Sequence, residues 1–536
     1  MKHYNDYKMR LNAFPVLPIL FFSFLFMSCY SDDSTTWEKE VGTIAISGMD
    51  SRYTRTSLVG EHLVINPTVD TGYSDSELEY SWVLVNGKTG TKDEHGKTIE
   101  PDTICREKNL DYEINLAPGD YQVRLYIRSK TNNYTATSFA VLVVQTELSQ
   151  GFYILKENAE GNTELDMVNE KYIFNLDEEV KVSEDLLEKI KGQSMKGKPL
   201  NLCPHYNMPY VEETSLKPTT CASLTVSSEA NEFYVLRTTD LATVFDRNTL
   251  FFEPAPADEV ALGMHPDLMS QTILITTKGV YANSGSGSTG IMGMPKIEGS
   301  FSNYYYYDPA SYGGGGLWDS SSHSIVWADR SQKQSLVSNE TSNLTSYECL
   351  YCGYSQLSNT ASNSEGKFIL RDRNTGERHL YMIKGTLSGK SLTKSAVFAS
   401  GSHMSKTDFY ATNCRTAAYI YCIDGGKIYA CVTNSENLDE VEITPLGIPS
   451  GETINYIVNQ FWYSRLGIGT QFNYLIVGTQ SGNTYKLYFY EMVGGTPSGA
   501  PFKTVQGTGK VKMVRYVGPN YRNTDLSQRY CYSMTN

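Results

Sequence analysis

Histidine, cysteine and serine residues could support hydrolysis or metal binding, but their spacing is not the one that such chemistry requires. None of the eight histidines stands in a His-Glu-x-x-His pattern, and the chain has no Gly-x-Ser-x-Gly turn and no phosphate-binding Gly-x-x-x-x-Gly-Lys-Ser/Thr loop. Cys349 and Cys352 have the separation of a zinc-knuckle pair, but no second pair matches them. Paired carboxylates for glycoside cleavage stay possible, because the fold sets their separation. We therefore predict no catalytic residue, no metal site and no cofactor, with an enzyme as the less favoured alternative.

Cys29 is the residue whose surroundings point most clearly to a chemical role. Basic residues precede an apolar run over 14–27, and the small Ser28 stands directly before the cysteine. This order is typical of a secretory signal, and the run is too short to cross a bilayer comfortably. The sequence Leu-Phe-Met-Ser-Cys at 25–29 resembles a bacterial lipobox, although its methionine departs from the commonest form. The resemblance implies that Cys29 becomes a lipidated N-terminus, and a lone cysteine without lipid is the alternative.

The residues after Cys29 are acidic, with Ser31, Asp32 and Asp33 in succession. They resemble the export tag that sends lipoproteins of Bacteroidetes to the outer face of the outer membrane. The resemblance implies a signal peptide over 1–28, an acidic tether over 29–40 and a location on the cell surface, held in the membrane through lipid.

The composition favours β-structure and argues against one class of partner. The chain of 536 residues carries a net charge of −13 with scattered acidic residues, whereas nucleic-acid-binding proteins carry basic patches. Its 39 tyrosines and 43 glycines are typical of strands and turns. Cys203 and Cys221 flank an expected loop and could form a disulfide, whereas three further cysteines are expected in the core, namely Cys414, Cys422 and Cys431.

Residues 41–147 have the pattern of a β-sandwich. Short runs of alternating apolar residues are separated by turns, as in Leu78–Leu84 and Tyr121–Ile127. Trp82 is expected in the core and Tyr121 at a corner. The Tyr-x-Trp strand, the Pro-Gly-x-Tyr-x-Val-x-Leu strand and the cysteine at position 29 resemble the PKD-like lipoproteins of Bacteroidetes. The resemblance implies an immunoglobulin-like or PKD-like module, although the Trp-x-Phe-Gly-Asp-Gly string of true PKD repeats is missing.

Residues 148–536 are predicted to form a seven-bladed β-propeller, so the whole chain is all-β. A unit of strand, polar turn and strand recurs, and after the first interval its starts lie 43 to 55 residues apart, which is the length of a propeller blade. Lys510–Val517 is the expected closing strand, and residues 183–191 predict a helix capped by Ser183. A second sandwich or an irregular β-domain is the alternative. The units occupy Gly151–Asn169, Ser223–Arg237, Thr272–Gly285, Ser324–Ser338, Lys367–Gly385, Ala418–Thr433 and Asn473–Met492.

Two aromatic groups are the candidate ligand-binding residues. Four tyrosines precede Pro309 and a run of glycines over 313–316, which predicts a loop because consecutive glycines weaken regular structure. Rings on such a loop can stack against sugars or peptide side chains, and burial between blades is the alternative. The candidates are Tyr304, Tyr305, Tyr306, Tyr307 and Trp318, with Trp462 and Tyr463 as the second group.

The family resemblance also implies a functional setting. Lipoproteins of this kind often accompany a SusC-type outer-membrane transporter and its SusD-type lid. The expectation is therefore a surface protein that binds a glycan or peptide nutrient for such a transporter. A surface propeller that hydrolyses glycans or peptides is one alternative, and an adhesion or scaffold lipoprotein is another.

Overall fold

A computed structural model describes residues 42–518, apart from 58–59, 87–88, 93–94, 213–215, 267–271, 284–287, 309–313, 329–332, 336–343, 358–363, 387–388 and 463–469. The predictions for Cys29, Ser31, Asp32, Asp33 and Tyr463 lie outside the described residues. The described chain is nearly all β and forms two compact units, one made mostly of residues before 142 and one that contains everything from 142 onward. Among the described helices, none has the length and apolar character needed to cross a bilayer.

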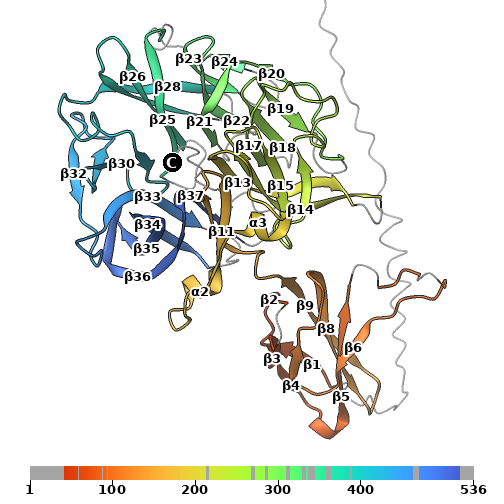
Figure 1. Cartoon of the computed structure of the whole chain (residues 1–536). Helices are drawn as coiled ribbons and strands as arrows, with labels where there is room; N and C mark the ends of the chain where they lie inside the picture. The colour runs from red at the N-terminus through yellow and green to blue at the C-terminus, as the bar shows by residue number, and fades with distance from the viewer. Residues whose placement is uncertain are drawn as a thin grey trace, which may run out of the picture. The chain divides into compact units, whose positions relative to one another are not determined.

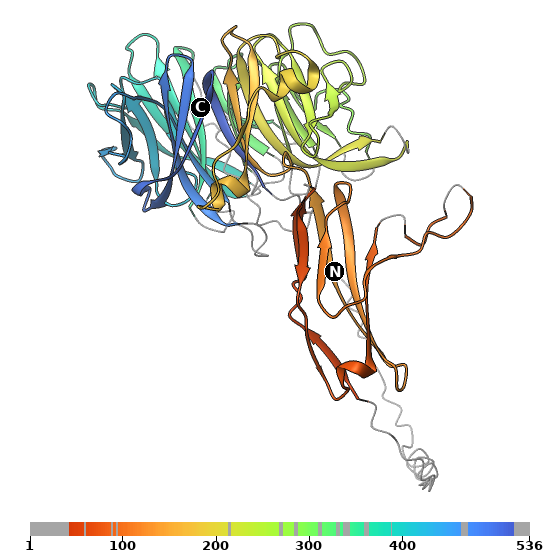
Figure 2. The same cartoon turned by 60° about the horizontal axis from the view of Figure 1, so that its bottom comes forward.

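The N-terminal unit is a β-sandwich (Figure 2, red and orange). Its larger sheet has five strands, and two smaller pairs of strands complete it. A short 3-10 helix, η2 (Asp75–Glu77), leads directly into one of the inner strands of the large sheet. In sheet order the large sheet consists of β2 (Arg52–Thr56), β9 (Thr135–Gln145), β8 (Gly119–Ser129), β5 (Leu78–Val85) and β6 (Asp102–Cys105), and the pairs are β1 (Ile44–Ser47) with β4 (Thr68–Thr71) and β3 (His62–Ile65) with β7 (Leu110–Glu113).

Trp82 and Tyr121 have the structural roles expected from the sequence. The Trp82 side chain on β5 is fully buried, and its indole nitrogen donates a hydrogen bond to the Glu107 carbonyl at 3.0 Å. The Tyr121 hydroxyl donates to the carbonyl of Ala117, four residues upstream, at 2.9 Å. This backbone contact is the tyrosine corner that fixes the turn between strands in sandwiches of this kind.

The C-terminal unit is a β-propeller. In the described part of the chain, strands between residues 151 and 517 form seven four-stranded sheets with antiparallel neighbours (Figure 1). This confirms the predicted fold class. Each of blades 2 to 7 uses four consecutive strands. Blade 2 consists of β13 (Pro199–Val211), β14 (Pro218–Ser228), β15 (Phe233–Arg237) and β16 (Thr243–Asp246), blade 3 of β17 (Ala261–Pro266), β18 (Thr272–Thr276), β19 (Gly279–Asn283) and β20 (Ile297–Glu298), and blade 4 of β21 (Phe301–Asp308), β22 (Gly314–Asp319), β23 (Ser324–Ala328) and β24 (Lys333–Ser335). Blade 5 consists of β25 (Tyr347–Gln356), β26 (Ser364–Asp372), β27 (Arg378–Thr386) and β28 (Gly389–Val397), blade 6 of β29 (Tyr410–Thr412), β30 (Tyr419–Asp424), β31 (Lys427–Val432) and β32 (Glu440–Ile443), and blade 7 of β33 (Thr453–Trp462), β34 (Phe472–Ser481), β35 (Thr484–Val493) and β36 (Thr496–Thr508).

Blade 1 closes the ring by combining the two ends of the propeller. Its sheet order is β12 (Val182–Ser183), β11 (Thr163–Asn169), β10 (Gly151–Glu157) and β37 (Lys510–Val517). β37 pairs antiparallel with β10, from Gly151 opposite Val517 to Glu157 opposite Lys510. In Figure 1 the last strand, in blue, lies at the inner side of this sheet. The predicted closing strand is therefore confirmed.

The apolar cores of the propeller lie between neighbouring blades. One cluster joins Leu155 and Leu165 of blade 1 to Leu224 and Val226 of blade 2, and similar clusters follow around the ring. At the closure, Phe152 of β10 contacts the rings of Phe472 and Phe489 of blade 7 and of Tyr516 on β37. Each blade therefore depends on its neighbours for a buried face, so stability is a property of the closed ring.

Two local predictions need correction, and one short helix was not predicted. The helix α3 (Leu186–Lys191) begins after Asp185, and Ser183 belongs to β12. A second short helix, α2 (Glu170–Phe174), was not predicted, and the Asn169 side chain caps it. The unit predicted at 324–338 begins at β23, one strand later than the other units begin within their blades. The glycines of β22 predict a loop when only neighbouring residues are considered.

Seven of the eight cysteines that the structure describes are buried thiols, and Cys105 is partly exposed. Cys203 and Cys221 lie on the paired strands β13 and β14, but Cys203 is opposite Thr225 and Cys221 is opposite Met208. The register keeps the two sulfurs apart, so the suggested disulfide does not form. Cys414, Cys422 and Cys431 are buried, as predicted for core residues. Cys349 and Cys352 are also buried, on β25.

Candidate functional site

The predicted aromatic loop is a pair of strands. Residues 304–307 belong to β21, and the glycines at 314–316 belong to β22, which pairs with β21 and places Tyr306 opposite Gly316. These strands contain glycines because the Tyr306 ring fills the space that a side chain would occupy. A Cβ atom on Gly316 would lie 2.3 Å from this ring and one on Gly366 of β26 would lie 2.0 Å from it. Glycine is thus needed in these strands for close approach of a buried ring.

Most of the predicted ligand-binding aromatics are buried. Tyr306 stacks on Tyr354 between blades 4 and 5, with ring centroids 5.9 Å apart. Tyr305, Trp318 and Trp462 are likewise buried, so these four side chains offer no surface to a ligand. Tyr304 is half-buried. The ligand-binding roles of Tyr304, Tyr307 and Tyr463 stay predictions, since the Tyr307 side chain and all of Tyr463 lie outside the described residues.

The structure places a pocket elsewhere, at one end of blade 3. Its volume is about 730 Å³, which lies within the usual range for small-ligand sites. One wall is the segment between β16 and β17. The other wall is the segment that leads into β20 and includes it. The pocket is lined by Phe251, Phe252, Glu253, Pro254, Ala255, Pro256, Glu259, Lys278, Tyr281, Gly293, Met294, Pro295, Glu298 and Gly299.

Backbone contacts hold the two walls together. Phe251 and Met292 form a parallel β-bridge, and the Phe252 amide donates to the Met292 carbonyl at 2.9 Å. The Met292 amide in turn donates to the Leu250 carbonyl at 2.8 Å. The guanidinium of Arg247 donates to the carbonyls of Pro256 and Glu259 and fixes the rest of the first wall. The pocket is therefore built on paired backbone and does not depend on side chains alone.

The walls expose large apolar side chains. Phe252 and Met294 are each 80% exposed, and Pro254, Pro256 and Pro295 stand beside them in the lining. Single exposed apolar residues are ordinary, but a group of them around a concave surface is a feature of binding sites. Proline also reduces the freedom of the unbound walls, which lowers the entropy lost on binding.

One acidic side chain at the pocket is buried. Glu259 is only 3% exposed. Its Oε1 atom accepts hydrogen bonds from the Thr276 hydroxyl at 2.5 Å and from the Tyr281 hydroxyl at 2.8 Å. Burial, and then the neighbouring carboxylate, raise the pKa of the Tyr281 hydroxyl well above its ordinary value, so this hydroxyl stays a donor. The arrangement fixes a carboxylate at the wall of an apolar pocket.

A second pocket, of about 800 Å³, lies on the sandwich. Its lining is mostly charged, and part of that charge is already paired. Arg128 contacts Glu79 at 3.5 Å, and the Lys130 ammonium donates to the Ser76 carbonyl. This pocket lacks the exposed apolar walls of the first one, which therefore remains the better candidate for binding.

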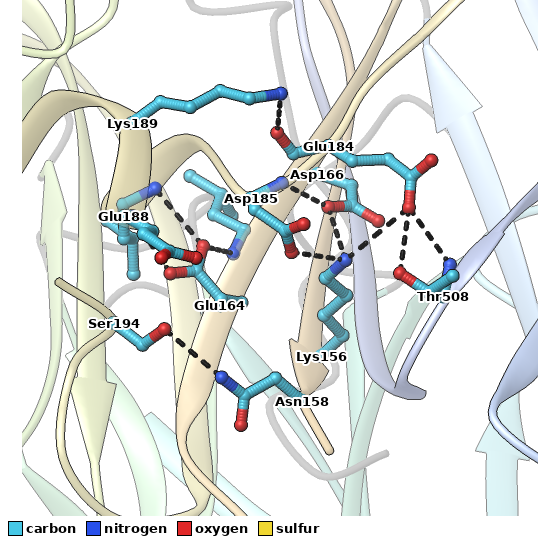
Figure 3. Close-up of polar contacts among 12 residues, drawn as sticks. Lys156, Asn158, Glu164, Asp166, Glu184, Asp185, Glu188, Lys189, Ser194 and Thr508 are labelled. Atoms are coloured by element: carbon cyan, nitrogen blue, oxygen red, sulfur yellow. Dashed lines mark hydrogen bonds and ion pairs between the residues drawn. The ribbon is translucent and has the colours of Figure 1, made fainter. Parts of the chain in front are cut away.

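A cluster of titratable groups lies at the ring closure (Figure 3). The Lys156 ammonium on β10 is 2.7 Å from Asp166 of β11 and 2.8 Å from Asp185. Lys156 and Asp166 are buried, and the Asp166 carboxylate also accepts hydrogen bonds from the Asp185 amide and from the Tyr485 hydroxyl of blade 7. Glu164 accepts from the amides of Leu187 and Glu188 and so caps α3.

Burial decides how this cluster titrates. It raises the pKa of Asp166 to about 6, against the opposing effects of Lys156, the Asp185 amide and Tyr485. Burial lowers the pKa of Lys156, but Asp166 and Asp185 outweigh it and leave that pKa above its ordinary value. Shifted carboxyl groups often mark active sites. Here Lys156, Asp166 and Asp185 belong to blade 1 and Tyr485 belongs to blade 7, so the cluster is explained by the packing of these two blades at the ring closure.

The buried histidines form a neutral core group. His265 on β17 is 2.9 Å from the Tyr305 hydroxyl. Burial lowers the pKa values of His205 and His265 to about 3, so both rings are neutral near pH 7. Within the residues that the structure covers, no group of three or more His, Cys, Asp or Glu side chains is arranged to hold a metal ion.

The pocket-lining residues could not be identified from local pattern alone. The available signal was the sequence Phe-Phe-Glu-Pro-Ala-Pro at 251–256, in which two adjacent aromatic residues precede two prolines. Such a segment cannot continue a central strand and exposes bulky side chains. The second wall, around Met294, has no comparable signal and is recognised only after the β-bridge to Phe251 is known.

Solved structures similar to this chain include several propellers. A quinoprotein alcohol dehydrogenase-like protein from Bacteroides thetaiotaomicron is 12% identical, with a TM-score of 0.38, and the match covers 89% of this chain and 99% of that one. The WD40 domain of SCAP from fission yeast is 9% identical, with a TM-score of 0.30, over 60% of this chain and 74% of that one. A prolyl endopeptidase is 9% identical, with a TM-score of 0.32, over 56% and 42%. At these scores the similarities carry no argument about activity.

No curated protein matches the chain. A family model does match its N-terminal part, in the region where the sandwich strands and the first strands of the propeller lie. The matched segment begins at Cys29 and ends at the first residue of β13. Residues 29–199 match the PKD-like family.

Proposed function

We propose that this protein is an outer-membrane surface lipoprotein that binds a nutrient, glycan or peptide, for a SusC/SusD-type uptake system. The observation that carries the proposal is the pocket of blade 3, where Phe252 and Met294 are exposed beside a rigid, proline-rich wall. Exposed apolar groups around a concave surface favour binding of a ligand. The signal-like N-terminus with Cys29 and the PKD-like match support the setting.

The membrane part of the proposal rests on Cys29. Replacing Cys29 with Ala is expected to leave the protein unlipidated and to move it from the membrane fraction to the soluble fraction, because two acyl chains supply stable anchoring. Fractionation of cells followed by immunoblotting measures this. Changing Asp32 and Asp33 to Ala is expected to keep the lipid but reduce cleavage by protease added to whole cells. A Cys29→Ala protein that stays with the outer membrane after salt washing would contradict the anchor.

The binding part of the proposal rests on the apolar walls. The double variant Phe252→Ser/Met294→Ser is expected to bind at least about tenfold more weakly, since each lost side chain removes roughly 1.5–3 kcal/mol of apolar burial. The measurement is retention of a tryptic casein digest and of a dextrin hydrolysate on immobilised full-length protein, with the retained compounds identified by mass spectrometry.

The matched control is Phe139→Ser, which removes an aromatic side chain that is 60% exposed on the sandwich. It is expected to retain nutrients like the wild type. New product ends in either mixture would favour the hydrolase alternative. Retention of neither mixture, together with co-purification of a transporter, would favour the scaffold alternative and overturn the binding role.

A further inference from the structure

The charges around the blade 3 pocket are mostly negative. Glu253, Glu259 and Glu298 line it, and the lining contains one cation, Lys278. The Lys278 ammonium already contacts Asp258 at 2.5 Å. A ligand that enters therefore meets an apolar surface with an excess of negative charge, and a positive group on the ligand is the complement.

Glu259 is the acidic residue that can act at short range. Both of its hydrogen bonds from side chains, those of Thr276 and Tyr281, go to the same oxygen, Oε1. No described residue donates a hydrogen bond to Oε2. A buried carboxylate has a large cost of desolvation unless a cation or several donors satisfy it. The open oxygen on a fixed, buried carboxylate is thus a site for an ammonium or guanidinium group.

The apolar lining narrows the kind of molecule that carries the cation. Phe252 and Met294, with the three prolines, form a surface suited to aliphatic and aromatic side chains of a ligand. The methionine side chain can adapt to ligands of different shapes. A neutral sugar can donate hydroxyl hydrogen bonds to Glu259, but it brings no positive charge to complement the negative charge of the lining. A peptide can present a cationic side chain and apolar side chains together.

We infer that the blade 3 pocket binds an oligopeptide that carries a lysine or arginine side chain next to apolar residues. The cation contacts Glu259, and the apolar residues pack on Phe252 and Met294. This inference rests on the proposed function, because it names the ligand class of the same pocket. Of the two nutrient classes proposed above, glycan and peptide, it selects peptide.

The test compares two peptides that differ by one charge. Ac-Ala-Leu-Lys-Leu-Ala-NH2 and the same peptide with norleucine in place of lysine are titrated by calorimetry into the full-length protein in detergent. The lysine peptide is expected to bind at least about tenfold more tightly, because its ammonium can donate a charged hydrogen bond to Glu259 and norleucine cannot. This comparison on the wild type needs no variant.

Glu259→Gln locates the effect. Glutamine keeps an oxygen for the Thr276 and Tyr281 hydroxyls but removes the charge, so the variant is expected to bind both peptides with equal affinity. The matched control is Glu436→Gln, an exposed glutamate between β31 and β32, which is expected to keep the preference for lysine. Thermal unfolding of both variants checks that they are folded.

The outcomes separate the inference from the proposed function. Equal affinity of the wild type for the two peptides would overturn the role of Glu259 while leaving nutrient binding intact. Binding of maltohexaose that depends on Phe252, without binding of either peptide, would overturn the peptide assignment and keep the proposed function. If peptides and maltohexaose all fail to bind, both the inference and the binding role are overturned.

Discussion

A chain that ends at Gly509 is expected to lose cooperative thermal unfolding of the propeller. It would lack β37, the inner strand of blade 1, which pairs with β10 along its length. The deletion removes the buried side chains of Met513, Val514 and Tyr516 from two interblade clusters and opens the ring. The expected loss is comparable to the whole stability of a domain, about 5–15 kcal/mol. Differential scanning calorimetry and near-ultraviolet circular dichroism measure it.

A synthetic peptide with the sequence of residues 510–517 provides the control. If the lost strand acts by pairing with β10, the added peptide is expected to restore part of the cooperative transition in a concentration-dependent way. A truncated protein that melts cooperatively at the temperature of the full-length protein would show that six blades and an incomplete seventh are enough.

Replacing Lys156 with Met is expected to lower the free energy of unfolding by about 3–5 kcal/mol. The variant would leave the buried Asp166 carboxylate without its cation, and such an uncompensated charge is strongly destabilising. Urea unfolding followed by fluorescence measures the change. The double variant Lys156→Met/Asp166→Leu removes both charges and is expected to recover much of the loss.

The pH dependence of this loss has a definite sign. Without Lys156 the pKa of Asp166 rises further above its unfolded value, so the protonated carboxyl becomes the favoured folded form. Stability of the variant then falls as pH rises through the range between the unfolded and folded pKa values. The deficit relative to the wild type is therefore expected to be larger at pH 8 than at pH 5. Equal deficits at both values would contradict this account of Asp166.

The propeller could be predicted because its units repeat. Pairs of strands joined by glycine turns, such as Asp424–Lys427 between β30 and β31, recur at the length of a blade. Repetition reveals the blade even when no single segment is decisive. The sandwich could be predicted for a similar reason, since Trp82 and Tyr121 belong to strands with clear alternation.

The buried aromatic pair of strands could not be predicted, because Gly316 is explained by the ring of Tyr306 on the paired strand, and a second glycine on another blade packs against the same ring. Gly366 makes room for Tyr306, which lies on another blade. Local rules treat consecutive glycines as a loop, and only the packed structure shows the ring that they accommodate. The blade 3 pocket was missed for the same kind of reason. Its two walls are about forty residues apart in sequence and meet through the bridge of Phe251 to Met292.

Closure by the last strand has a consequence for the way the chain acquires its structure. The contacts that complete blade 1 join distant parts of the chain, as in the bond from Tyr516 to Glu170, 346 residues apart. Contacts between residues so far apart in the sequence form slowly. The hydrogen bond between Tyr516 and Glu170 cannot form until β37 has been synthesised. Until then β10 exposes an unpaired edge that could recruit a strand from a second chain. The interval between synthesis of the first and last strands is thus the period in which this protein is most exposed to misassembly.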